Sequence, residues 1–117
     1  MKKFRFVNEA AAKDFRALPK EIQRQFGLDL TAVQHGGVPF SAYKHIQKSV
    51  GPGAIELIEN GSPAYRAVYC AKFEDTVYLL HAFTKTTNGV DKKAMNTASE
   101  RYKEMLRQIK ENKGAGR

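Results

Sequence analysis

Residues 51–87 read GPGAIELIENGSPAYRAVYCAKFEDTVYLLHAFTKTT and contain most of the strand-forming sequence of the chain. Val, Ile, Leu, Tyr and Phe, which favour β-strands, gather in three segments of this stretch: Ala54–Asn60, Ala64–Phe73 and Thr76–Thr87. Asn60-Gly61-Ser62-Pro63 and Glu74-Asp75 separate the segments, and both are typical of turns. Two hairpins in series predict a three-stranded antiparallel meander.

Side chains of a strand point alternately to its two faces. In the middle strand this rule places Arg66 on one face with Val68, Cys70 and Lys72. In the last strand it groups every second residue on one face: Val77, Leu79, His81, Phe83 and Lys85. Both faces are largely apolar, so we expect the sheet to be covered on both sides. Arg66 and Lys85 are expected at the same end of the sheet, and the strand register decides whether they also share a face.

The composition fits one globular domain over residues 1–117. The chain is long enough for a single hydrophobic core, and its 42% hydrophobic and 27% charged residues are ordinary values. No apolar run reaches the length of a membrane span or of a signal-peptide core, so we expect a cytoplasmic protein. Cys70 stands alone in the middle of a strand, where we expect a small buried hydrophobe.

The charge balance is strongly basic. Lys and Arg number 20 against 12 Asp and Glu, which gives a formal net charge of +8. Such a balance favours a polyanionic partner, and nucleic acid is the usual one. An acidic protein partner is the alternative.

Apolar residues at helical spacing predict two helices before the meander. Phe4–Val7 precedes them as a short strand, expected at the sheet edge or beside the last strand. Asn8 can cap a helix over Glu9–Leu18, and a second helix runs from about Pro19 to His35. We expect this helical hairpin to lie on the sheet with its apolar side.

A third helix follows the meander. Asp91 can cap it, and its apolar stripe runs to about Lys110; residues 111–117 are expected to form a flexible tail. The order β-α-α-β-β-β-α predicts an α+β fold, in which a small antiparallel sheet packs against the helical hairpin and the C-terminal helix.

Basic residues flank the meander on both sides. Residues 38–53 are predicted to form a loop, and cations in its interior lead into the first strand of the meander. The candidates for contact with a nucleic-acid backbone are Lys44, His45, Lys48, Lys92 and Lys93. Ordinary solvated loop lysines are the alternative for Lys44 and Lys48.

Catalytic motifs of the common kinds are absent from the sequence. It contains no phosphate-binding glycine loop, no metal-spaced Cys and His, and no serine elbow, so no metal or cofactor is expected. His81, within an apolar strand, is either a hydrogen-bonded core histidine or a possible acid or base. Cations around a small sheet suit chemistry on a phosphodiester, where positioning and charge neutralisation carry most of the effect.

The element order and the segments AYRAVYCAKF and VYLLHAFTKTT resemble the RelE/HigB superfamily of bacterial toxins, in its phage-derived, HigB-like branch. The resemblance covers about Phe4 to Leu106 and is strongest over residues 51–87. It implies a RelE-like fold and the toxin component of a type II toxin–antitoxin system. Members of the superfamily typically cut mRNA in the ribosomal decoding site.

The resemblance also assigns roles to particular residues. Arg66 matches the strand arginine that contacts the scissile phosphate, and Lys85 matches the basic residue that closes the last strand. Lys44 and Lys48 correspond loosely to the basic loop before the sheet. The sequence departs from the branch at Thr86, where a second lysine is common. It also has no match for the tyrosine or histidine that some relatives place after the last strand, so the general base is left unassigned.

The expected activity is therefore metal-independent, ribosome-dependent cleavage of mRNA that inhibits translation. The expected partners are the ribosome, mRNA and a cognate antitoxin of helix-turn-helix type, which would form a toxin–antitoxin hetero-oligomer. Two alternatives stay open. One is a ParE-like toxin that poisons gyrase without nuclease chemistry, and the other is a binding module that has lost its activity.

Overall fold

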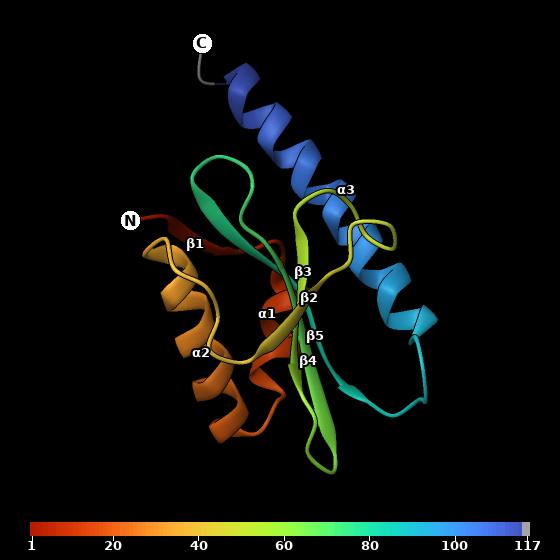
Figure 1. Cartoon of the computed structure of the whole chain (residues 1–117). Helices are drawn as coiled ribbons and strands as arrows, with labels where there is room; N and C mark the ends of the chain where they lie inside the picture. The colour runs from red at the N-terminus through yellow and green to blue at the C-terminus, as the bar shows by residue number, and fades with distance from the viewer. Residues whose placement is uncertain (116–117) are drawn as a thin grey trace.

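The computed structural model describes residues 1–115 and consists of one sheet with helices on both of its faces (Figure 1). Its elements, in chain order, are β1 (Lys3–Phe6), α1 (Glu9–Arg16), α2 (Lys20–Gln34), β2 (Ala42–His45), β3 (Ala54–Glu59), β4 (Ala64–Cys70), β5 (Thr76–Lys85) and α3 (Lys92–Ala115). The α+β class and the RelE-like arrangement of elements are confirmed. The meander is confirmed too, with strands that end up to three residues earlier than predicted.

The sheet has five strands in the order β1-β5-β4-β3-β2. β1 lies at the edge and beside the last strand, as predicted, but it runs parallel to β5. The sheet is therefore mixed, and the prediction of an antiparallel sheet is wrong for this strand. The pattern of residues 4–7 identifies a strand but carries no information about its direction, which follows from how the chain leaves β1 into α1.

β2 is the strand that the sequence analysis missed, because residues 38–53 were predicted to form a loop. It pairs antiparallel with β3, with Lys44 opposite Glu56. All four of its residues are exposed, so the apolar alternation that marks a half-buried strand is missing.

A β-bulge at Leu80 changes which residues of β5 share a face. Tyr69 of β4 pairs with Leu79, whereas its neighbour Val68 pairs with His81, so Leu80 has no opposite residue. The predicted common face from Val77 to Lys85 is therefore wrong. Val77 and Leu79 lie on the α2 side of the sheet, and Leu80 lies on the α3 side.

Two hydrophobic clusters, one on each face, hold the layers together. On the α2 side, Phe26 and Leu30 pack against Leu57, Tyr69 and Leu79. On the α3 side, the cluster combines strand and helix residues: Val68, Cys70, Leu80, Ala98, Tyr102 and Met105. Cys70 is fully buried, as expected, and its burial raises the pKa of its thiol.

The helix caps agree with the sequence, and the last helix is longer than predicted. Asn8 Oδ1 accepts from the Ala11 N–H at 2.8 Å, and Asp91 Oδ1 accepts from the Ala94 N–H at 3.0 Å. α3 continues to Ala115, five residues past the predicted end at Lys110. Residues 116–117 of the predicted tail lie outside the described residues. Among the helices described, none is long and apolar enough to cross a membrane.

Candidate functional site

The face of the sheet that is turned toward α3 carries a row of charged side chains across four strands. Lys44 lies opposite Glu56, Glu56 opposite Val68, and Val68 opposite His81. The next pair on this face is formed by Arg66, two residues before Val68, and Phe83, two residues after His81. Lys85 follows Phe83 by two positions, so it shares this face with Arg66. The register thus brings both predicted catalytic residues to one face at one end of the sheet.

Arg66 is buried, with 7% of its surface exposed. Its Nη1 donates to the carbonyl oxygens of Glu59 and Tyr65, both at 3.0 Å, and its Nη2 donates to Asn60 Oδ1 at 3.0 Å. These three bonds tie the guanidinium to the turn between β3 and β4. They use three of its five N–H donors. Neither neighbouring carboxylate bonds to it, since Glu56 pairs with Lys44 and Glu59 accepts from the Gly61 N–H.

Lys85 is bound to the chain that follows it. Its Nζ donates to the carbonyl oxygen of Thr87 at 2.8 Å and also to that of Gly89. Lys44, whose side chain is 58% exposed, makes an ion pair of 3.5 Å with the buried carboxylate of Glu56. Lys44, Glu56 and Lys85 line a common hollow of about 50 Å³, to which Asp91 adds a second carboxylate.

Of the residues predicted to contact a nucleic-acid backbone, Lys44, His45 and Lys48 line one hollow of about 360 Å³, and Lys92 and Lys93 lie outside it. Lys44 faces α3, whereas the next residue, His45, faces the other way and packs edge-on against Tyr43 with ring centroids 6.2 Å apart. Lys48 lies in the turn after β2 and is exposed. Lys92 and Lys93 are exposed at the start of α3. The structure therefore does not gather these five residues into one patch.

His81 belongs to a cluster that joins α1, β5 and α3. Its Nδ1 is 3.1 Å from Asp14 Oδ2 and 3.1 Å from Arg101 Nη1. Arg101 Nη1 also donates to Asp14 Oδ2 at 2.6 Å and to the Leu80 carbonyl at 3.1 Å. The ring stacks on Phe83 with centroids 5.0 Å apart and planes inclined by 22°. His81 is thus a hydrogen-bonded, largely buried histidine.

The surroundings of His81 favour its neutral form. Burial lowers the pKa of its ring, the Arg101 guanidinium lowers it further, and the Asp14 carboxylate opposes both. A neutral imidazole near pH 7 can accept a proton from a substrate. A cleft of about 280 Å³ lies beside the ring, and its lining includes Phe83, Lys93 and Arg101.

Asp14 and Arg101 are site residues that the sequence analysis missed. The side chain of Arg101 in α3 is only 14% exposed, although arginine is usually a surface residue. A signal for both was present in the helical spacing. Asp14 follows the buried Ala11 by three positions, and Arg101 follows the buried Ala98 by three, so each lies next to the face that packs on the sheet.

Among residues 1–115, no three His, Cys, Asp or Glu side chains lie close enough together to hold a metal ion. The site combines cations, a partly buried His–Asp–Arg cluster and the ring of Phe83 on one face of the sheet.

The model of one protein family, described as phage derived protein Gp49-like (DUF891), matches residues 13–103 of the chain. The chain belongs to this family. Gp49-like proteins fall within the HigB/RelE-like toxin group, which agrees with the resemblance seen in residues 51–87. No curated protein matches the chain. The Gp49-like region runs from Lys13 to Lys103 and so includes every member of the site from Asp14 to Arg101.

Proposed function

We propose that this Gp49-like protein is the toxin of a type II toxin–antitoxin system and cleaves mRNA on the ribosome. The observation that carries the proposal is the position of Arg66 and Lys85 on one face at one end of the sheet. Membership of a family within the HigB/RelE-like toxin group supports the toxin role. The net charge of +8 suits a partner rich in phosphate.

The reaction that fits these residues is attack of a ribose 2′-hydroxyl on the adjacent phosphorus. The bond from phosphorus to the 5′ oxygen breaks, which gives a 2′,3′-cyclic phosphate and a free 5′-hydroxyl. Arg66 would stabilise the charge that develops on the phosphate, using the two N–H donors that its hairpin bonds leave. Its bonds to the turn hold the guanidinium in place before the substrate arrives.

Proton transfer would use groups on either side of Arg66. Phe83, the residue opposite Arg66, separates His81 from Lys85 along β5. A phosphate above Arg66 would therefore have the neutral imidazole on one side and the ammonium group on the other. His81 would accept the proton of the 2′-hydroxyl, and Lys85 would donate one to the leaving 5′ oxygen. The nearby Lys44 would add positive charge.

The test is induced expression in a bacterium, followed by mapping of the 5′ ends of translated messages. The wild type is expected to arrest growth and to cut within reading frames, and Arg66→Ala is expected to abolish both effects. Because Arg66 also stabilises the β3–β4 turn, Asn60→Ala is the matched control: it removes one hairpin bond and keeps the guanidinium. Asn60→Ala is expected to lose less activity than Arg66→Ala, and wild-type cuts by a folded Arg66→Ala protein would show that Arg66 does not act on the phosphate.

The partners that this function requires are mRNA, the ribosome and a cognate antitoxin, proposed to be of helix-turn-helix type. A toxin–antitoxin hetero-oligomer would be the resting form. Co-expression of the gene next to the toxin gene should restore growth, and the two proteins should co-purify.

One observation favours a second function, gyrase poisoning of the ParE kind. Arg66 is 7% exposed and bonded to the hairpin, so a structural role alone would account for its position. A toxin that acts by binding needs no exposed phosphate-binding arginine. Inhibition of gyrase in a supercoiling assay, together with growth arrest without mRNA cuts, would favour this function over cleavage.

A further inference from the structure

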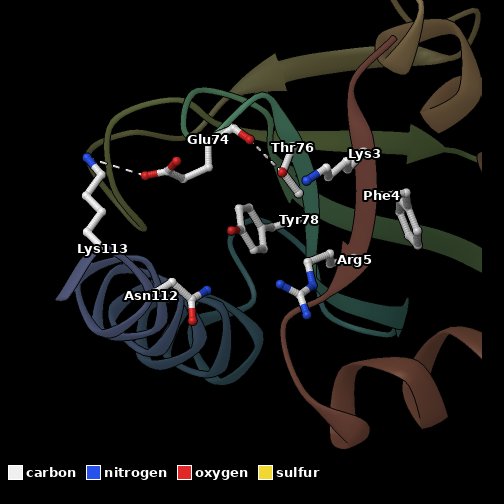
Figure 2. Close-up of a pocket in the computed structure, with 8 residues that line it drawn as sticks. All are labelled: Lys3, Phe4, Arg5, Glu74, Thr76, Tyr78, Asn112 and Lys113. Carbon is white, nitrogen blue, oxygen red and sulfur yellow. Dashed lines mark hydrogen bonds and ion pairs between the residues drawn. The ribbon is translucent and has the colours of Figure 1, made fainter. Parts of the chain in front are cut away.

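A cleft of about 610 Å³ lies at the opposite end of the sheet from Arg66 and Lys85. Figure 2 shows its two walls, which are β1 and the C-terminal end of α3, with the start of β5 between them. β1 contributes Lys3 and Arg5, and α3 contributes Asn112 and Lys113. Glu74, Thr76 and Tyr78 complete the polar lining.

The register of β1 explains why its cations line this cleft. Lys3 lies opposite Thr76 and Arg5 opposite Tyr78, so both cations sit beside the polar residues of β5. Phe4, between them in sequence, packs with the α2-side hydrophobic cluster. Alternation along the edge strand thus separates an apolar face from a cationic one.

The charges in the cleft are only partly paired. Lys113 Nζ is 3.3 Å from Glu74 Oε1, and the neighbouring Lys2 Nζ is 3.5 Å from Asp75 Oδ1. Within the described residues 1–115, Lys3 and Arg5 form no ion pair. Two exposed cations therefore face the cleft with their charges available to a ligand.

Tyr78 supplies a hydrogen-bond donor between the two walls. Its hydroxyl points toward α3 in Figure 2. Burial raises the pKa of this phenol, although the Arg5 guanidinium acts in the opposite direction, so the hydroxyl stays protonated at neutral pH. Thr76 is not available in the same way, because its Oγ1 donates to the Glu74 carbonyl at 2.8 Å.

We propose that this cleft binds the phosphate groups of a nucleic-acid backbone. Lys, Arg, Tyr and Asn side chains are the groups that commonly contact phosphate oxygens. An acidic protein segment would carry the same negative charge as a phosphate backbone. Stable docking of a peptide also needs apolar anchor pockets, however, and the lining of this cleft is mostly polar. Two of the large exposed apolar side chains, Val38 and Phe40, lie elsewhere, in the connection between α2 and β2.

This proposal goes beyond the proposed function because the cleft would bind nucleic acid without cleaving it. Tyr78 and Lys85 are seven residues apart on β5, so about 23 Å of strand separates the cleft from the Arg66 end. The two ends would hold different parts of one nucleic acid. Lys3, Arg5, Asn112 and Lys113 lie outside residues 13–103, the part of the chain that the family model matches.

The test is fluorescence anisotropy with a labelled 2′-O-methyl RNA of about twelve nucleotides, measured over a range of salt concentrations. This probe lacks the 2′-hydroxyl nucleophile, so the result does not depend on nuclease activity. The Lys3→Gln/Arg5→Gln double variant is expected to lower affinity at low salt. It should also reduce the slope of the logarithm of affinity against the logarithm of salt concentration by about 1.4, because each lost contact to a single strand removes about 0.7. Tyr78→Phe is expected to weaken binding without a change of slope.

The matched control is Lys20→Gln/Arg24→Gln, which removes the same charge from exposed positions of α2. If both double variants weaken binding equally, net charge alone explains the effect and the cleft is not a site. A glutamate-rich peptide serves as the second probe. If the β1 variant loses this peptide and keeps the RNA, the cleft binds an acidic protein and the proposal is wrong.

Discussion

The carboxylate of Asp14 in α1 and the guanidinium of Arg101 in α3 meet at 2.6 Å beside Nδ1 of His81. Eighty-seven positions separate the two residues in the sequence. Their contact joins the N-terminal and C-terminal helices on one face of the sheet. It also fixes the electrostatic surroundings of His81, which lies on the same face as Arg66 and Lys85.

Arg101→Met is expected to lower the free energy of unfolding by about 1.5–3 kcal/mol, because it leaves a partly buried carboxylate without its charged donor. It should also raise the pKa of His81, since the guanidinium lowers it. Urea denaturation measures the first effect, and NMR titration of the ring measures the second. Arg107→Met, at an exposed position of the same helix, is the control and should stay within about 0.5 kcal/mol of wild type.

The pKa of His81 predicts how stability changes with pH. In the folded protein the pKa lies below its ordinary value of 6.5, so the unfolded chain binds the proton more readily. The free energy of unfolding should therefore fall as the pH drops through about 6.5 toward the folded pKa, and this contribution is fully present above 6.5. Asp14, Arg101 and Asp91 are the charged groups that act on the ring.

His81→Gln should flatten this part of the stability profile, measured by urea denaturation between about pH 5 and pH 7.5. Its absolute stability is expected to change as well, so the slope is the quantity to compare. His45→Gln, at an exposed position, should keep the wild-type slope. Equal slopes for wild type and His81→Gln would contradict the assigned pKa shift.

Two glycines should respond to alanine in opposite directions. A Cβ on Gly51 would lie 2.5 Å from the ring of Tyr102, whose hydroxyl donates to the Pro52 carbonyl at 2.6 Å. Gly51→Ala should therefore cost about 1–3 kcal/mol through overpacking. Gly27, inside α2, has nothing within 4 Å of its added Cβ, and Gly27→Ala should gain about 0.5–1 kcal/mol. Urea denaturation of both variants checks the pair, and a gain at Gly51 would contradict the close packing of the ring.

The turn between β4 and β5 contains two residues in the left-handed region, Glu74 with φ 57° and Asp75 with φ 49°. A residue with a Cβ is disfavoured there by about 1–2 kcal/mol, so Glu74→Gly should stabilise the protein by about 0.5–1 kcal/mol. Glu74→Gln keeps the Cβ and loses the exposed ion pair with Lys113, and it should change stability by less than about 0.5 kcal/mol. If the two substitutions change the urea midpoint equally, the stabilisation by Glu74→Gly does not come from the backbone conformation of residue 74.

Much of the fold could be predicted because its signals are local. Strand residues between turn residues identify β3, β4 and β5, and Asn8 and Asp91 mark helix starts through bonds made three residues away. β2 could not be found because an exposed strand has no apolar alternation. The bulge at Leu80 was hidden because the run Val77–Leu80 is apolar at every position, so either face accepts its residues.

The site was predictable only in part, for a similar reason. Arg66 and Lys85 could be placed at one end of the sheet from strand order alone. Predicting that they share a face would have required the strand register. Predicting the bonds of Arg66 to the turn would have required the conformation of residues 59–65. The Asp14–Arg101 contact depends on how α1 and α3 approach β5, and no spacing within either helix encodes that distance.

The parallel pairing of β1 with β5 has a consequence for synthesis of the chain. β5 lies between β1 and β4, and both hydrophobic clusters depend on its residues. The ribosome makes β1 and α1 long before β5, so β1 has no strand to pair with, and α1 lacks its contacts with β5, until residues 76–85 emerge. The nascent chain therefore stays without its native core through most of translation. A protein proposed to act on ribosomes would acquire its active shape only as its own synthesis ends.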